Sequence, residues 1–210
     1  MTRSRANFAP MAGRLVLAAL VLAAACSAGC GSSQSSAGSP STSSHPMVTR
    51  PPTTPPDTFS GGGRTTVVGS GTPDETVLLE RIDVGRHDGF DRVVFRFRGA
   101  DLPGYRVGFV PRPLREDGSG NEIPIDGEKI IGVRMDPASG FDLEDEGSLV
   151  YKGPKRIEGS QYGTQVVTEL ARTGDFESVL NWAIGLRHAS DFRVLRLDRP
   201  PRLVVDVADS

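Results

Sequence analysis

The sequence has few of the residues that build catalytic and metal centres. Its 210 residues include two cysteines, three histidines and one tryptophan, and aromatic residues make up 6%. Both cysteines, Cys26 and Cys30, precede the region with strand-like patterns, which excludes disulfides, thiolate zinc sites and a cysteine nucleophile there. The sequence GSQYG places Gln161 where a serine elbow needs its nucleophile, and no glycine-rich phosphate loop is present. We therefore expect no metal, no cofactor and no enzymatic activity.

An excess of one charge is also missing. The chain carries 24 Lys and Arg against 26 Asp and Glu, a net charge of −2. Residues 1–73 hold five arginines and one aspartate (5 − 1 = +4), and residues 74–210 hold 19 basic and 25 acidic residues (19 − 25 = −6). A mildly acidic domain is repelled by polyanions, so we expect no nucleic-acid partner.

No apolar run is long enough to cross a bilayer as a helix. The longest, LVLAALVLAAA, has 11 residues from Leu15 to Ala25, about 16 Å of helix against about 30 Å of hydrocarbon. Three arginines precede it, and small residues follow. This order is typical of a secretory signal over residues 1–25.

The small residues that lead into a cysteine resemble the lipobox of bacterial lipoproteins. Cys26 directly follows the apolar run, whereas Cys30 follows SAG and precedes GSS. Neither has the leucine three residues upstream that the family prefers. The resemblance implies an exported protein with its lipid on Cys26, or alternatively Cys30, anchored to the outer face of the cell membrane. An ordinary signal peptide is the remaining alternative.

Residues 26–73 have the composition of a disordered tether. Serine, threonine, proline and glycine dominate, with PPTTPP from Pro51 and GGG from Gly61. Such a segment buries too little apolar surface to offset its chain entropy. We place one folded domain after it, over residues 74–210.

That domain has the patterns of an all-β protein. In DRVVFRFRG, residues 91–99, apolar and arginine side chains alternate with a period of two, as in a half-buried strand. Further strands are expected at 76–86, 105–110, 128–135, 165–171, 178–188, 192–197 and 201–208. The alternative of a short helix at 177–186 conflicts with the one-in-two spacing of its large apolar residues. We predict an antiparallel β-sandwich of about seven or eight strands.

Four segments carry a family resemblance. DRVVFRF, PGYRVGFV, RTGDFESVLNWAIGL and DRPPRLVVDV together resemble the AMIN-like domain of actinobacterial cell-envelope lipoproteins, over about residues 76–209. The related AMIN domains are β-sandwich modules of envelope amidases and secretins. The resemblance implies a sandwich fold, a place in the envelope and binding of peptidoglycan or another cell-wall polymer without catalysis.

The arginines of the 91–99 strand are the candidate ligand-binding residues. Arg92, Arg96 and Arg98 share one strand face, and guanidinium groups bind carboxylates in a bidentate manner. Tyr105 is a candidate for stacking on sugars, whereas the alternation around Trp182 places that ring in the core. The alternative is that these arginines pair across strands with carboxylates at positions 80, 83 or 206.

Carboxylate clusters offer weaker candidates. The group formed by Asp83, His87, Asp88 and Asp91 around one turn has a single imidazole, too few for a transition-metal site. Residues 117–128 match a calcium loop in part, but Glu122 stands where that loop needs glycine. An acidic hairpin is the alternative there.

We expect a monomer that binds wall polymer, with two rival functions. One is an adaptor that pairs proteins through a sheet edge, and the other is a hydrolase that uses carboxylates of two acidic insertions, residues 115–127 and 138–147.

Overall fold

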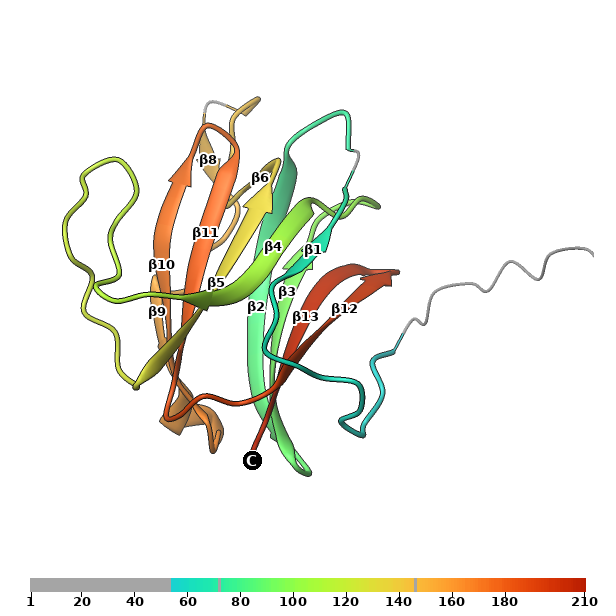
Figure 1. The fold of residues 1–210 in the computed structure, drawn as a ribbon. Coiled ribbons are helices and arrows are strands. Elements are labelled where there is room, and N and C mark those ends of the chain that lie inside the picture. Colours follow the sequence, from blue (N-terminus) through green and yellow to red (C-terminus); the bar gives the residue numbers. More distant parts are fainter. Residues whose placement is uncertain (1–53, 72, 146) are drawn as a thin grey trace, which may run out of the picture. The chain divides into compact units, whose positions relative to one another are not determined.

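The computed structural model describes residues 54–71, 73–145 and 147–210, which form an antiparallel β-sandwich (Figure 1). One sheet has six strands in the order β1, β4, β5, β11, β10 and β9, namely Val67–Gly69, Gly104–Val110, Lys129–Asp136, Val179–Leu186, Val167–Phe176 and Arg156–Glu158. The other has five in the order β12, β13, β3, β2 and β6, namely Phe192–Asp198, Pro201–Ala208, Phe90–Phe97, Val77–His87 and Ala138–Ser139. A small pair, β7 (Phe141–Asp142) and β8 (Ser148–Leu149), and a 3-10 turn, η1 (Gly159–Tyr162), complete the described elements.

The eight long strands are those that period-two alternation predicts, which confirms the fold class. β11 is a strand and not a helix, and its large side chains Leu180, Trp182 and Ile184 enter the core between the sheets. Trp182 is 1% exposed and meets Phe95 and Tyr151 edge to face. The shorter strands β1, β6, β7, β8 and β9 were not expected.

Strand β3 lies at the centre of its sheet and is buried on both faces. Its neighbours are β13 and β2, and Val93 and Phe95 point into the core. The other face, predicted to meet solvent, is covered along half its length, since Phe90 and Arg92 are 0% and 5% exposed. The turn that precedes β3 is a two-residue hairpin formed by Asp88 and Gly89, with a φ of 81° at Gly89.

Residues 54–71, which sequence composition assigned to the tether, lie against the sandwich; we call them the strap. Gly63 exchanges two backbone hydrogen bonds with Phe192 at the edge of β12. A few residues later, β1 pairs with β4 of the other sheet. The strap therefore joins the edges of both sheets, and the folded region begins before residue 74. The predicted signal segment, Cys26, Cys30 and residues 1–53 as a whole lie outside the described residues.

Among the described residues, no helix is long and apolar enough to cross a membrane.

Candidate functional site

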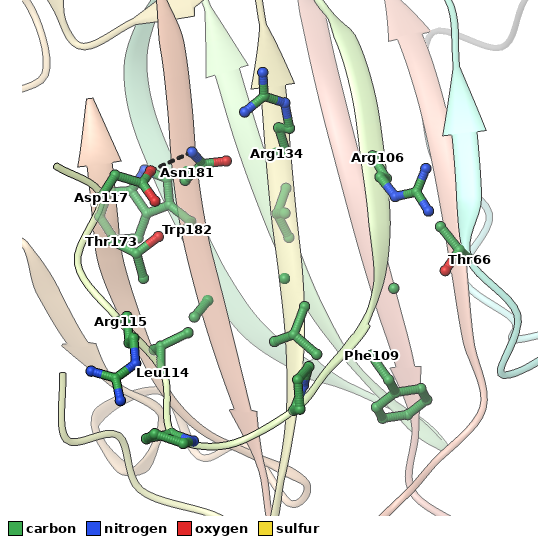
Figure 2. Close-up of a pocket in the computed structure, with 17 residues that line it drawn as sticks. Thr66, Arg106, Phe109, Leu114, Arg115, Asp117, Arg134, Thr173, Asn181 and Trp182 are labelled. Carbon is green, nitrogen blue, oxygen red and sulfur yellow. Dashed lines mark hydrogen bonds between the residues drawn. The ribbon is translucent and has the colours of Figure 1, made fainter. Parts of the chain in front are cut away.

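A groove crosses the outer face of the six-stranded sheet, as Figure 2 shows. Residues of β4, β5 and β11 that point away from the core form its base, and the loop after β4, residues 111–127, forms one wall. Its volume is about 570 Å³, within the range of small-molecule binding pockets, about 300–1,000 Å³.

The strand register aligns the smallest residues of three strands to make the floor. Gly108 of β4 pairs with Gly132 of β5, and Gly132 pairs with Ala183 of β11. A β-carbon on Gly132 would lie 2.8 Å from a methyl group of Val110, and one on Gly108 would lie 2.5 Å from the Thr66 hydroxyl. Glycine at both positions lets these two side chains approach the sheet closely.

The wall formed by residues 111–127 is held together by internal hydrogen bonds and joined to the sheet by another. Within the wall, Arg112 donates to the carbonyl oxygens of Ile125, at 3.0 Å, and of Gly127. The backbone N–H of Asp117 donates to the Thr173 carbonyl at 2.8 Å. These bonds hold the wall in place, and its apolar side chains (Leu114, Ile123 and Ile125) pack with Ile130, Ala171 and Ala183 of the sheet.

The groove is lined with more cations than anions. Arg106, Arg115 and Arg134 line it with one carboxylate, that of Asp117. Asp117 is engaged, because its Oδ2 accepts a 2.5 Å hydrogen bond from the side-chain amide of Asn181 (Figure 2). The electrostatic balance therefore favours an anionic ligand group.

Two of these arginines face each other across neighbouring strands. Arg106 and Arg134 are directly paired in the β4–β5 register, and like charges in that position destabilise a sheet. Arg134 has a carboxylate partner, since its Nη2 lies 3.1 Å from Asp136. No hydrogen bond or ion pair joins the Arg106 guanidinium to another part of the described chain. This cation is available to a ligand.

The aromatic residues of the groove do not present their rings to it. Trp182 points into the core, and Phe109 packs edge to face on Phe192 at a centroid distance of 5.8 Å. Where these two residues line the groove, they offer no stacking platform.

Two of the arginines predicted to bind ligand pair with carboxylates across strands, as the alternative interpretation proposed. Arg92 and Arg193 flank Asp206 in register and both donate to it, with Nε–O distances of 2.6 and 2.9 Å. Nη2 of Arg193 lies 2.8 Å from the carboxylate but off the direction of a hydrogen bond. Arg96 pairs with Asp83. The guanidinium of Arg92 is therefore enclosed in protein contacts.

The strap covers this Arg–Asp–Arg triad. Carbonyl oxygens of Pro56 and Ser60 accept hydrogen bonds from Arg92 at 2.7 Å and from Arg193 at 3.2 Å. The Phe59 ring lies between them, 5.1 Å from the guanidinium carbon of Arg193. The triad thus connects the strap to β3, β13 and β12.

The remaining predicted ligand-binding residues are more accessible but far apart in the fold. The Arg98 side chain is 52% exposed, and its Nη1 lies 3.9 Å from Asp142. Tyr105 belongs to the other sheet, where its ring covers Gly69 of β1. Burial raises the pKa of the Tyr105 hydroxyl, and Arg196 opposes that shift. Ligand binding by Arg92, Arg96, Arg98 and Tyr105 stays a prediction.

The predicted cluster around the β2–β3 turn separates into unrelated roles. Asp83 pairs with Arg96, and the His87 ring stacks on Phe90 at 4.8 Å. Asp91 is fully buried and accepts hydrogen bonds from three consecutive backbone N–H groups, those of residues 165–167, at 2.7–3.0 Å. Asp91 therefore links the two sheets just before β10.

The acidic insertions adopt local turns. Residues 115–122 form a hairpin closed by a bridge between Arg115 and Glu122, as the alternative to a calcium loop proposed. The Asp142 carboxylate accepts hydrogen bonds from the backbone of the next turn. A cavity of about 320 Å³ beside both insertions is lined by Glu116, Asp117 and Asp175 and by no carboxylate of residues 142–145. Within the described ranges, no group of three or more His, Cys, Asp or Glu side chains is placed to hold a metal.

The groove residues themselves were missed from sequence, although a signal for them exists. β4 contains Arg106-Val-Gly108 and β5 contains Gly132-Val-Arg134. When two strands with these mirrored triplets pair antiparallel, arginine meets arginine and glycine meets glycine.

Comparison with known families identifies the domain. The model of the AMIN-like domain family matches residues 77–209, more than half of the chain, and the protein belongs to this family. Membership implies a non-catalytic module of the cell envelope. No curated protein and no solved structure matched the chain.

Proposed function

We propose that this protein is an exported envelope lipoprotein whose AMIN-like domain binds peptidoglycan or another cell-wall polymer through the groove on the six-stranded sheet. The observation that carries the proposal is Arg106, a groove cation without a protein partner in the described chain, placed opposite a second arginine. A like-charged cross-strand pair weakens the sheet, so its presence in a groove supports a role in binding an anionic group. Family membership supports the envelope setting.

Retention on purified sacculi tests the binding function. The full-length protein in detergent is mixed with sacculi at low salt, and the bound fraction is measured for wild type, Arg106→Gln and Arg86→Gln. Arg86 is an exposed arginine of β2 on the other sheet, which makes it the matched control. We expect Arg106→Gln to bind sacculi with an affinity lowered about ten-fold or more, because a hydrogen bond to a charged group contributes about 1.5–3 kcal/mol. A wild-type protein that is not retained would refute the proposal.

The lipid anchor is a separate part of the proposal. We assign the lipid to Cys26, with Cys30 as the alternative, because the short apolar run ends at Cys26. Mass spectrometry of the mature protein is expected to show the diacylglycerol increment and its loss in Cys26→Ala. A mature protein without that increment, together with unchanged release from the membrane in both Cys26→Ala and Cys30→Ala, would contradict the anchor.

One observation supports the rival function of a protein adaptor. The backbone N–H and C=O of Phe192 point away from β13, out of the edge of β12, and are hydrogen-bonded to Gly63. Because this direction alternates along a strand, the N–H and C=O of Val194 and Arg196 point out of the same edge. Within the described chain, Gly63 is the only partner on that edge of β12. An exposed edge can accept a strand from another protein. Crosslinking in cells from position 194 that captures a protein, with no retention on sacculi, would favour the adaptor.

A further inference from the structure

The groove also limits which part of a wall polymer it can recognise, an inference that rests on the proposed function. Protein sites for sugars commonly use an aromatic face that stacks on the ring. Here the rings of Phe109 and Trp182 point into the core, and no other aromatic residue lines the groove. The site therefore lacks the surface that a saccharide needs most.

The groove instead has two facing arginines on one side and a mainly apolar opposite side, which carries one arginine, Arg115, whose Nη1 donates to the Gly120 carbonyl at 2.9 Å (Figure 2). In the strand register, Arg106, Arg134 and Asn181 form a row on one side of the Gly108–Gly132–Ala183 floor. The other side is formed by Val110 with the loop that follows β4, through Pro111, Pro113 and Leu114. In Figure 2, the guanidinium groups of Arg106 and Arg134 lie at the end of the groove opposite Phe109 and Leu114. A suitable ligand has an anionic end and small apolar groups next to it.

The floor has a further consequence for ligand shape. Two glycines and an alanine stand in register across three strands, and the side chains of Thr66 and Val110 lie over the two glycines, so a ligand running across this row contacts these small side chains. Neighbouring strands are about 4.8 Å apart, and the three strands together span about 10 Å. An extended backbone of about three residues, at about 3.3 Å each, covers this distance.

We infer that the groove recognises a short, extended peptide with small apolar side chains and a free carboxylate, which Arg106 binds at the cationic side. The Arg106 guanidinium supplies paired N–H donors that match the two carboxylate oxygens. Val110 and Leu114 contact the small side chains. The glycan of a wall polymer lies outside the groove in this arrangement.

Soluble probes separate this inference from the proposed function. We would titrate the full-length protein in detergent with acetyl-trialanine, its C-terminal amide and chitotetraose, using both L- and D-alanine forms, and follow binding by calorimetry. The acid is expected to bind at least ten-fold more tightly than the amide, and chitotetraose is expected not to bind. Arg106→Gln should remove the difference between acid and amide, whereas Arg86→Gln should keep it.

A second variant keeps the test independent of the arginine. Val110 is 36% exposed, so Val110→Asp places a carboxylate in the wall with little effect on the core, and thermal melting verifies the fold. This variant should weaken the acid and the amide alike, because position 110 contacts the small side chains and lies on the opposite side of the groove from Arg106. The inference would be overturned if the wild-type protein bound acid and amide equally, bound chitotetraose alone, or bound neither peptide form. The proposed function would survive each of these results if sacculi still retained the protein, and would fall separately if they did not.

Discussion

Neutralising Asp206 gives the sharpest test of how the strap is held. The carboxylate is 0% exposed, and the side chains of its partners Arg92 and Arg193 are each 6% exposed. Asp206→Asn keeps the shape but leaves two buried guanidinium groups without a counter-charge. Breaking a buried ion pair in this way costs about 3–5 kcal/mol, a large share of the roughly 5–15 kcal/mol that holds a domain folded.

Urea unfolding at neutral pH, followed by circular dichroism, measures this loss. Asp83→Asn is the matched control, because it removes the same charge from a pair with Arg96 whose side chains are 24% and 38% exposed. Exposed pairs contribute about 0–1 kcal/mol. If Asp206→Asn costs no more than Asp83→Asn, the assignment of the triad as a buried structural element is wrong.

A triple variant identifies the source of the cost. Replacing Arg92 and Arg193 with Met and Asp206 with Leu removes all three charges together, and apolar replacement of a buried ionic cluster is often neutral or stabilising. We expect this variant to recover most of the stability that Asp206→Asn loses. A triple variant as unstable as the single one would show that the strap needs these hydrogen bonds and not merely charge balance.

Three further outcomes are expected. Asp91→Ala removes the acceptor of three backbone N–H groups, two of them buried, so hydrogen exchange at residues 165–167 should accelerate and stability should fall by about 1–3 kcal/mol or more. Burial raises the pKa of Tyr151 from 10.0 to about 12. The unfolded chain therefore loses this proton at lower pH than the folded chain, and stability falls as the pH rises from 10 towards 12. Tyr151→Phe should flatten that part of the pH–stability curve. Deletion of residues 54–71 uncovers Phe90 and the triad, so the melting temperature should drop well below that of the full chain; an unchanged melting temperature would contradict the role of the strap.

The long strands could be predicted because each carries its own alternation of apolar and polar residues. The short strands could not, since three residues such as Val67–Gly69 show no period and pair only because β4 offers an edge. The strap was missed for a related reason. It is fixed largely through backbone carbonyls, those of Pro56, Ser60 and Ser70, and composition does not reveal which carbonyls meet an arginine.

The candidate site was also only partly predictable from the sequence. Arginines on alternating positions of β3 were visible in the sequence, but their partners depend on register, which places Asp206 beside Arg92. A shift of one residue would turn every side chain to the opposite face. The groove depends on register twice, for the glycine floor and for the facing arginines. Only the mirrored triplets of β4 and β5 signalled it in advance.

The strap has a mechanical consequence. It binds β12 through Gly63 and β4 through β1, so the chain entering the domain at its N-terminal side contacts one edge of each sheet. A pull delivered from that side reaches the Pro56 and Ser60 contacts with the buried arginines before it reaches either sheet. Tension on the entering chain is thus carried first by the ionic triad, and it reaches Thr66 and β1 at the groove only after the contacts of Pro56, Ser60 and Gly63 have been released.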